Sequence, residues 1–132
     1  MCNEKTVLIV EDEPLIARII DLRLCNDGYH TLIANDGIEG VALAILNQPD
    51  VIVMDVRMPG KDGITSITEL RENCVTQEIP VVVLSASLVD QAAALDAGAR
   101  FFLTKPFQHK TLLAAVNTAL TERKQSFAAD LN

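Results

Sequence analysis

Short apolar runs alternate along the chain with longer segments of helical periodicity. The runs at residues 6–10 (TVLIV), 51–54 (VIVM) and 81–84 (VVVL) are uncharged and rich in β-branched residues, which predicts fully buried strands. Residues 29–34 (YHTLIA) are more polar and predict a strand near an edge of a sheet, and residues 101–104 (FFLT) predict a fifth strand.

Each of these runs is followed by a segment with helical signals. Pro14 suits the first turn of a helix, because its missing N–H costs nothing there. Gly28 suits a left-handed helix end, residues 35–37 (NDG) form a turn and candidate N-cap, and Gly98 closes an alanine-rich segment. We therefore expect helices over residues 14–26, 38–46, 88–97 and 111–122, and another that follows a loop at 62–63 and runs to about residue 73.

Five strand–helix pairs with continuous apolar strands predict an α/β protein whose parallel sheet is covered on both faces. The best topology is a doubly wound, flavodoxin-like fold with strand order 2-1-3-4-5 and five flanking helices. A chain of 132 residues predicts one domain, which we place at residues 1–123. Residues 124–132 are expected to be a tail or the start of a linker, either frayed or extending the last helix.

Composition narrows the possible partners. The net charge of −7 and the isoelectric point near 4.7 argue against direct nucleic-acid binding and against a polybasic membrane site. Three cysteines without CxxC spacing suggest reduced thiols rather than a disulfide framework or a zinc site. The chain shows neither a signal peptide nor an apolar run long enough to span a membrane, so we expect a cytoplasmic location.

Polar side chains stand where the predicted strands end. Glu11 and Asp12 follow the first strand, Asp55 the third, Ser85 the fourth and Lys105 the fifth. Ligands of open α/β sheets bind beyond the carboxyl ends of the strands, where the strand order reverses. The first and third strands are neighbours in this order, so we expect their acids to converge.

These residue types fit phosphoryl transfer. Converging carboxylates repel one another unless they bind a proton or a cation, and hard oxygen ligands in an open cleft suit Mg²⁺. A carboxylate can attack phosphorus, while a lysine and a hydroxyl neutralise and position the group. Each residue also has an ordinary role: Asp12 or Ser85 as a helix cap, Asp55 in a turn, Lys105 in solvent. Their joint occurrence at the strand ends favours the functional interpretation.

Four segments resemble the receiver domain of two-component response regulators, over residues 5–123. They are VLIVEDEP (7–14), VIVMDVRMPGKDG (51–63), VVVLSA (81–86) and FFLTKPF (101–107). The resemblance implies a signalling switch rather than a metabolic enzyme, with intrinsic self-phosphorylation and autophosphatase chemistry. Its phosphodonor would be a sensor histidine kinase or a histidine phosphotransfer protein, and its output domain or effector is not identified by the sequence.

The resemblance also implies a role for each site residue. Asp55 is the expected phosphoacceptor, and Mg²⁺ would be bound by Glu11, Asp12, Asp55 and the main-chain carbonyl of Arg57. Lys105 and Ser85 would bind the phosphoryl group, and the Lys105–Pro106 bond would be cis.

Phe102 matches the aromatic that turns inward after Ser85 moves, or it is ordinary core. This movement would remodel the surface of the fourth helix, fifth strand and fifth helix, a possible homodimer interface. The side chain of Arg57 would either shield the phosphoryl group from water or lie in solvent. The alanine-rich segment 88–97 would either receive a partner or be well buried.

Two other functions remain open from the sequence. A Mg²⁺-dependent phosphatase working through a phosphoaspartate usually has a second acid two residues after its nucleophile, where this chain has Arg57. A phosphorylation-independent binding module would usually have lost part of the acid, hydroxyl and lysine set.

Overall fold

One parallel sheet of five strands lies at the centre of the protein. The structure, a computed structural model, describes residues 5–58 and 60–131, with side chains described as far as residue 122. The sheet order β2-β1-β3-β4-β5 confirms the predicted topology. The strands are β1 (Thr6–Val10), β2 (His30–Ala34), β3 (Val51–Asp55), β4 (Val81–Ser85) and β5 (Phe101–Thr104).

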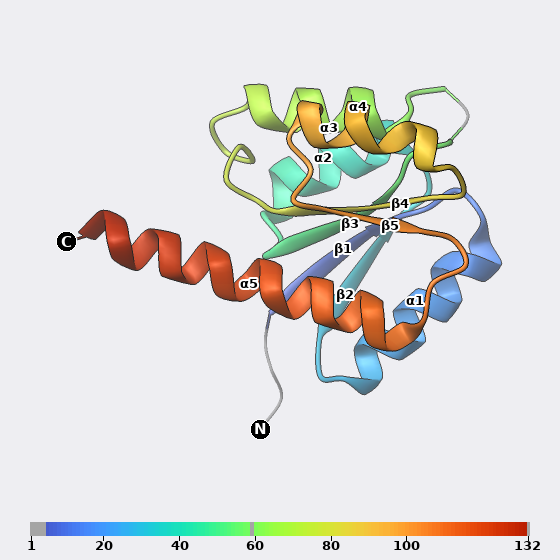
Figure 1. Cartoon of the computed structure of the whole chain (residues 1–132), viewed down its shortest axis with the longest axis horizontal. Coiled ribbons are helices and arrows are strands. Elements are labelled where there is room, and N and C mark those ends of the chain that lie inside the picture. The colour runs from blue at the N-terminus through green and yellow to red at the C-terminus, as the bar shows by residue number, and fades with distance from the viewer. Residues whose placement is uncertain (1–4, 59, 132) are drawn as a thin grey trace.

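Helices cover both faces of this sheet, as predicted. Helices α1 and α5 lie on one face, and α2, α3 and α4 lie on the other (Figure 1). Helix α5 continues to Leu131, and its last turns project past the sheet; the domain boundary at residue 123 stays a prediction. The helical elements are α1 (Pro14–Asn26), α2 (Gly37–Asn47), α3 (Gly63–Glu72), η1 (Leu88–Asp90), α4 (Gln91–Ala97) and α5 (His109–Leu131).

The segment predicted as one buried or partner-binding helix over residues 88–97 is two elements. It opens with the 3₁₀ turn η1, whose first turn is capped by the Ser87 side chain accepting from the Val89 N–H at 3.2 Å. Only Ala94 of the following α4 is buried, so the well-buried alternative is wrong. Its small alanine side chains cover little of the sheet, which leaves α4 largely exposed.

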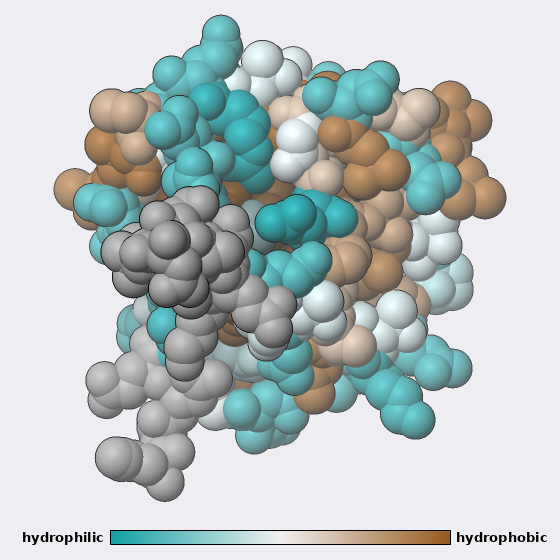
Figure 2. Space-filling view, turned by 60° about the vertical axis from the view of Figure 1, so that its left-hand side comes forward, coloured by the Kyte–Doolittle hydropathy of each residue, from teal (hydrophilic) through white to brown (hydrophobic). Residues whose placement is uncertain are grey.

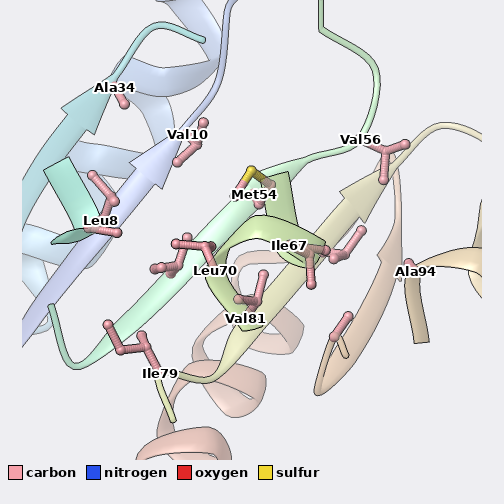
Figure 3. Packing of buried hydrophobic residues seen from close by; sticks show 14 of the residues in the cluster. Leu8, Val10, Ala34, Met54, Val56, Ile67, Leu70, Ile79, Val81 and Ala94 are labelled. Atoms are coloured by element: carbon pink, nitrogen blue, oxygen red, sulfur yellow. The ribbon is translucent and has the colours of Figure 1, made fainter. Parts of the chain in front are cut away.

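Burial follows the strand order and explains the polarity of the sequence runs. All residues of β3 and β4 are buried, whereas β2 and β5, at the two edges, are mostly half-buried. Figure 3 shows the core beneath α3, where Ile67 and Leu70 face Met54 and Val81 of the sheet. A second cluster fills the space between the sheet and helices α1 and α5. The central strands are therefore continuous apolar runs because both of their faces are covered.

On the face seen in Figure 2, polar and apolar side chains are interspersed. Cys25 and Cys74 are exposed free thiols, in agreement with the prediction, and Cys2 lies outside the described residues. Among the described residues, no helix is both long and apolar enough to cross a membrane.

Gly63 permits a tight connection between β3 and α3. Its N–H donates to the carbonyl of Val56 at 2.8 Å, and a Cβ atom on Gly63 would lie 2.4 Å from the carbonyl oxygen of Asp55. Because that oxygen belongs to the backbone of the central strand, it cannot move aside cheaply. The absence of a side chain at residue 63 therefore sets how closely α3 approaches the end of β3.

We expect Gly63→Ala to lower the free energy of unfolding by about 3 kcal/mol, since overpacking against backbone forces a shift. Gly60→Ala is the matched control. Gly60 has a positive φ of 81°, but a Cβ there would meet nothing within 4 Å, so only backbone strain of about 1 kcal/mol is expected. Urea denaturation measures both losses, and equal losses would contradict the close-approach argument.

Candidate functional site

The carboxyl ends of β1 and β3 bring three predicted acids together. Glu11 and Asp12 directly follow β1, Asp55 is the last residue of β3, and these two strands are paired along their length. Carboxylate oxygens of the three residues all lie within 4.8 Å of one another. The predicted convergence of the acids is therefore found.

Lys105 joins this cluster from the end of β5. Its Nζ lies 2.8 Å from Oδ1 of Asp55 and 3.1 Å from Oε1 of Glu11. The backbone N–H of Lys105 donates to the carbonyl of Ser85 at 2.8 Å, which ties the end of β5 to the end of β4. The Lys105–Pro106 bond is cis, as predicted.

Burial shapes the acid–base properties of the cluster. The side chain of Asp55 is 7% exposed and that of Glu11 only 1%. Burial raises the pKa of Asp55, with Asp12 adding to the rise and Lys105 opposing it. Burial, followed by the charge of Asp55, raises the pKa of Glu11. The ionised acids are thus costly to hold together and favour a cation beside them.

Lys105 remains a strong cation in this setting. Burial alone would lower the pKa of its ammonium group, but the hydrogen bond and charge of Asp55, together with Glu11, outweigh burial and raise it. One ammonium faces three carboxylates, so the cleft keeps an excess of negative charge. The cleft can therefore accept a divalent cation without losing its lysine.

Helix capping does not account for the acids after β1. Glu13 occupies the N-cap position of α1, and its side chain makes no capping hydrogen bond. Glu11 accepts the N–H of Glu13 at 3.3 Å through Oε2, while its Oε1 remains paired with Lys105. Asp12 is half-buried beside them. These carboxylates are thus placed by the end of β1 rather than by the start of the helix.

Ser85 lies at the end of β4, completely buried, with its hydroxyl turned toward an acid that sequence reasoning missed. Its Oγ donates to Oδ2 of Asp90 at 2.6 Å. Arg57 also binds this carboxylate, with its Nε 3.2 Å from Oδ2 and its Nη2 3.1 Å from Oδ1. The Arg57 side chain is 64% exposed, but Asp90 holds its guanidinium rather than leaving it free in solvent, and shielding of a phosphoryl group stays a prediction.

A sequence signal for Asp90 existed. Ser87 and Asp90 have the S-x-x-D spacing of a capping box, in which the acid accepts the N–H of the serine. Here the box is not closed, since the Ser87 side chain caps Val89, two residues on, while the Asp90 carboxylate binds Ser85 and Arg57. The spacing alone would have predicted a helix start, and the long-range partners come from the ends of β4 and β3.

Phe102 lies on β5 beside Val83 of β4 and is half-buried against the core under α2, α3 and α4. Its ring is therefore held partly at the surface, next to the strand that ends in Ser85.

We expect Asp55→Asn to raise the melting temperature by a few degrees at neutral pH in EDTA, because it removes a costly buried charge. As the pH falls, parental Asp55 takes up its proton at a higher pH than it does in the unfolded chain. The parent therefore gains stability on acidification, and the difference between the two proteins should shrink. Asp96→Asn, at an exposed position of α4, removes one charge elsewhere and should leave the melting temperature unchanged. A destabilised Asp55→Asn protein in thermal unfolding monitored by circular dichroism would contradict this account.

Known proteins share both this sequence pattern and this fold. The model of the response regulator receiver domain matches residues 7–117. A curated relative, the DNA-binding dual master transcriptional regulator RpaA of Synechocystis, is 40% identical over 116 residues, which are 86% of this chain and 48% of that protein. The chain thus spans about half the length of this relative.

Two solved receiver structures illustrate the likeness. The Francisella response regulator 1452 receiver domain is 35% identical, with a TM-score of 0.83 over 90% of this chain and 98% of that one. The receiver domain of the sensor histidine kinase PA1611 from Pseudomonas aeruginosa is 30% identical, with a TM-score of 0.84 over 90% of this chain and 99% of that one. With the acid cluster and lysine at the strand ends, these matches show that the chain belongs to the response regulator receiver domains, the signalling switches of two-component systems.

Proposed function

We propose that the chain is a phosphoacceptor that receives a phosphoryl group on Asp55 from a histidine kinase or a histidine phosphotransfer protein. The observation that carries this proposal is the convergence of Asp55, two further acids and Lys105 at one edge of the sheet. Family membership supports this reaction, and Asp55 as nucleophile, Lys105 as counter-charge and the three acids as cation ligands would lie close enough to act together.

Magnesium is the cofactor that fits this donor set. Glu11, Asp12 and Asp55 would hold it, with the main-chain carbonyl of Arg57 as a further oxygen ligand. When bound, the ion neutralises charge on the transferring group. The similar receiver domain of PA1611 has a magnesium ion coordinated in its active-site cleft. Both carboxylate oxygens of Glu11 already have partners, Lys105 and the N–H of Glu13, which favours an indirect role for it, through water, and leaves half-buried Asp12 as the more accessible ligand.

The transfer step uses the carboxylate of Asp55 as nucleophile. One of its oxygens forms a bond to phosphorus while the P–N bond of the donor phosphohistidine breaks, and the electron pair returns to the imidazole. Lys105, now 2.8 Å from Asp55, is placed to bind a phosphoryl oxygen and offset its charge. Attack of water on the same phosphorus later releases inorganic phosphate and regenerates the carboxylate.

A new dianion at Asp55 would change the partners of Ser85 and Lys105. We propose that Ser85 moves toward the phosphoryl group and that the ring of Phe102, half-buried beside Val83, turns inward. The surface formed by α4, β5 and α5 would then differ between the two states. That surface is our candidate for an effector, an output domain or a second copy of this chain.

A groove beside the site suits the phosphodonor. It has a volume of about 430 Å³ and is lined by α1 residues, including Ile16 and Ile19, together with Lys105, Pro106 and Phe107. Its walls are largely apolar, and Lys105 belongs both to the groove and to the acid cluster. A donor helix bound there would present its phosphohistidine next to Asp55, and such donors are expected in the cytoplasm.

DNA binding by the relative RpaA is not carried over to this chain. The net charge of −7 makes direct contact with DNA phosphates unfavourable. We propose that any transcriptional output depends on a separate DNA-binding unit, controlled by the receiver surface.

Incubation with acetyl phosphate should give a single phosphoryl adduct by intact-protein mass spectrometry. The adduct should require both Mg²⁺ and Asp55, because the metal and the nucleophile act in the same step. Asp55→Asn should show no adduct, and Lys105→Ala should form it at least roughly tenfold more slowly, as expected for the loss of one charge-stabilising donor.

Asp96→Asn should behave as the parent and serves as the control for charge alone. An adduct that persists in Asp55→Asn at the parental rate would overturn the site assignment. No adduct on the parent under any condition would favour a phosphorylation-independent binding module, whereas turnover of small phosphomonoesters would favour the phosphatase.

Saturating MgCl₂ should raise the melting temperature of the parent, because an ion that binds only the folded state stabilises it by mass action. At about 100 times the dissociation constant the gain is about 2.7 kcal/mol. Asp12→Asn should lose most of this gain, since it removes the accessible carboxylate. An equal gain in Asp12→Asn would place the ion elsewhere.

A further inference from the structure

A chain of hydrogen bonds links the end of β4 to the start of α4. The N–H of Ser87 donates to Oγ of Ser85 at 3.1 Å, and this hydroxyl donates in turn to Oδ2 of Asp90 at 2.6 Å. The guanidinium of Arg57 binds both oxygens of Asp90. The carbonyl of Ser87 also lies 3.3 Å from the Ser85 hydroxyl, at a longer distance than the carboxylate.

The carboxylate is the stronger partner for the buried hydroxyl. Ser85 is fully buried and the side chain of Asp90 is 12% exposed, so the bond between them is shielded from water. The hydrogen bond from Ser85, followed by Arg57, lowers the pKa of Asp90 against the opposing effect of burial. Asp90 is therefore ionised at neutral pH, and a hydrogen bond to a charged acceptor is about twice as strong as a neutral one.

The Ser85 hydroxyl lies between two groups, the N–H of Ser87 and the carboxylate of Asp90, that bond to each other directly in a capping box. The acid of such a box normally accepts the N–H of the N-cap serine three residues earlier. Ser87 is the N-cap of η1, and its N–H reaches Asp90 only through the Ser85 hydroxyl. If that hydroxyl turned away, the N–H of Ser87 would lose its acceptor, and Asp90 stands three residues later in the sequence, the separation at which a capping box forms.

We propose that Asp90 is a positioning residue that exchanges hydrogen-bond partners when the switch operates. In the unphosphorylated protein it holds the Ser85 hydroxyl on the side of η1, away from the phosphoacceptor. When Ser85 turns to a phosphoryl oxygen, Asp90 accepts the N–H of Ser87 directly and completes the capping box. This inference rests on the proposed role of Asp55 as phosphoacceptor.

The exchange leaves both states fully bonded. In the first state Ser85 bridges Ser87 and Asp90, and in the second it binds the phosphoryl group while Asp90 closes on Ser87. Neither arrangement leaves a buried donor without an acceptor, which would cost free energy comparable to a lost hydrogen bond. Arg57 stays bound to Asp90 throughout and keeps the carboxylate at this position between the two strand ends and η1. The position of the Ser85 hydroxyl therefore determines which of two hydrogen-bond networks forms, and every donor has an acceptor in both.

The test compares Asp90→Asn with Asp96→Asn, each with Ser85 present and with Ser85→Ala. Asp90→Asn keeps the size of the acceptor but removes its charge, so Ser85 is released more easily. Modification of Asp55 by acetyl phosphate with Mg²⁺, followed by mass spectrometry, should be roughly fivefold faster than in the parent. The gain should vanish in the Ser85→Ala background, and Asp96→Asn should react at the parental rate in both backgrounds.

Amide hydrogen exchange gives a second readout that does not depend on the reaction. In the unphosphorylated protein the N–H of Ser87 should exchange faster in Asp90→Asn than in Asp96→Asn, because its acceptor Ser85 is held less firmly. After phosphorylation this N–H should stay protected in the parent and lose protection in Asp90→Ala.

Several results would overturn the proposal. If the parent is modified normally but Asp90→Asn reacts at the parental rate, Asp90 does not hold Ser85. A gain that survives in Ser85→Ala would show that the charge of Asp90 acts directly on the reaction. If the parent itself forms no adduct, the phosphoacceptor assignment is wrong, and the partner exchange fails with it. Measurement of the parent therefore distinguishes failure of the proposed function from failure of this inference alone.

Discussion

The parallel arrangement of the strands is the constraint on which the rest of the structure depends. In a parallel sheet the carboxyl ends of all strands lie on the same side, so residues far apart in the sequence meet there without any contact between their helices. The order β2-β1-β3-β4-β5 makes β1 and β3 neighbours, which brings Glu11 and Asp12 against Asp55. The ends of β4 and β5 add Ser85 and Lys105. The site therefore follows from the sheet order and from a few polar residues at its edge.

The carboxyl ends of the strands also concentrate unfavourable negative charge. Burial and mutual repulsion raise the pKa of Glu11 and Asp55, and one lysine offsets only part of that repulsion. The apolar strands beneath, with their side chains covered on both faces, hold the carboxylates in place. The protein thus uses the stability of its core to maintain a cluster that would disperse in a flexible chain. The repulsion is relieved when a cation binds beside the acids.

The sequence predicted the strands and the five polar residues at their ends because each rests on a local signal, and it predicted the strand order because few topologies suit five alternating strand–helix pairs. Continuous β-branched runs identify central strands, and the acids, serine and lysine stand directly after them. The Ser85–Asp90 bond and the fixed Arg57 guanidinium were not predictable in this way. Each depends on a side chain reaching across from another element, and the S-x-x-D spacing suggested a more common local bond. The exposure of α4 was left open beside the buried alternative, since a run of alanines is equally compatible with a buried helix.

Helix α4 buries few side chains against the core, and this affects which parts of the domain can change in sequence. Buried Ala94 and half-buried Ala97 join this helix to the core, while Leu95 of α4 and Leu88 and Val89 of the preceding η1 are exposed. Substitutions on the outer side of α4 therefore remove little from the packing that holds the sheet together. Duplicated copies of the domain can acquire different recognition surfaces there while they keep the same chemistry at the strand ends. The outer side of α4 is thus a place where side chains can change with little loss of folding stability.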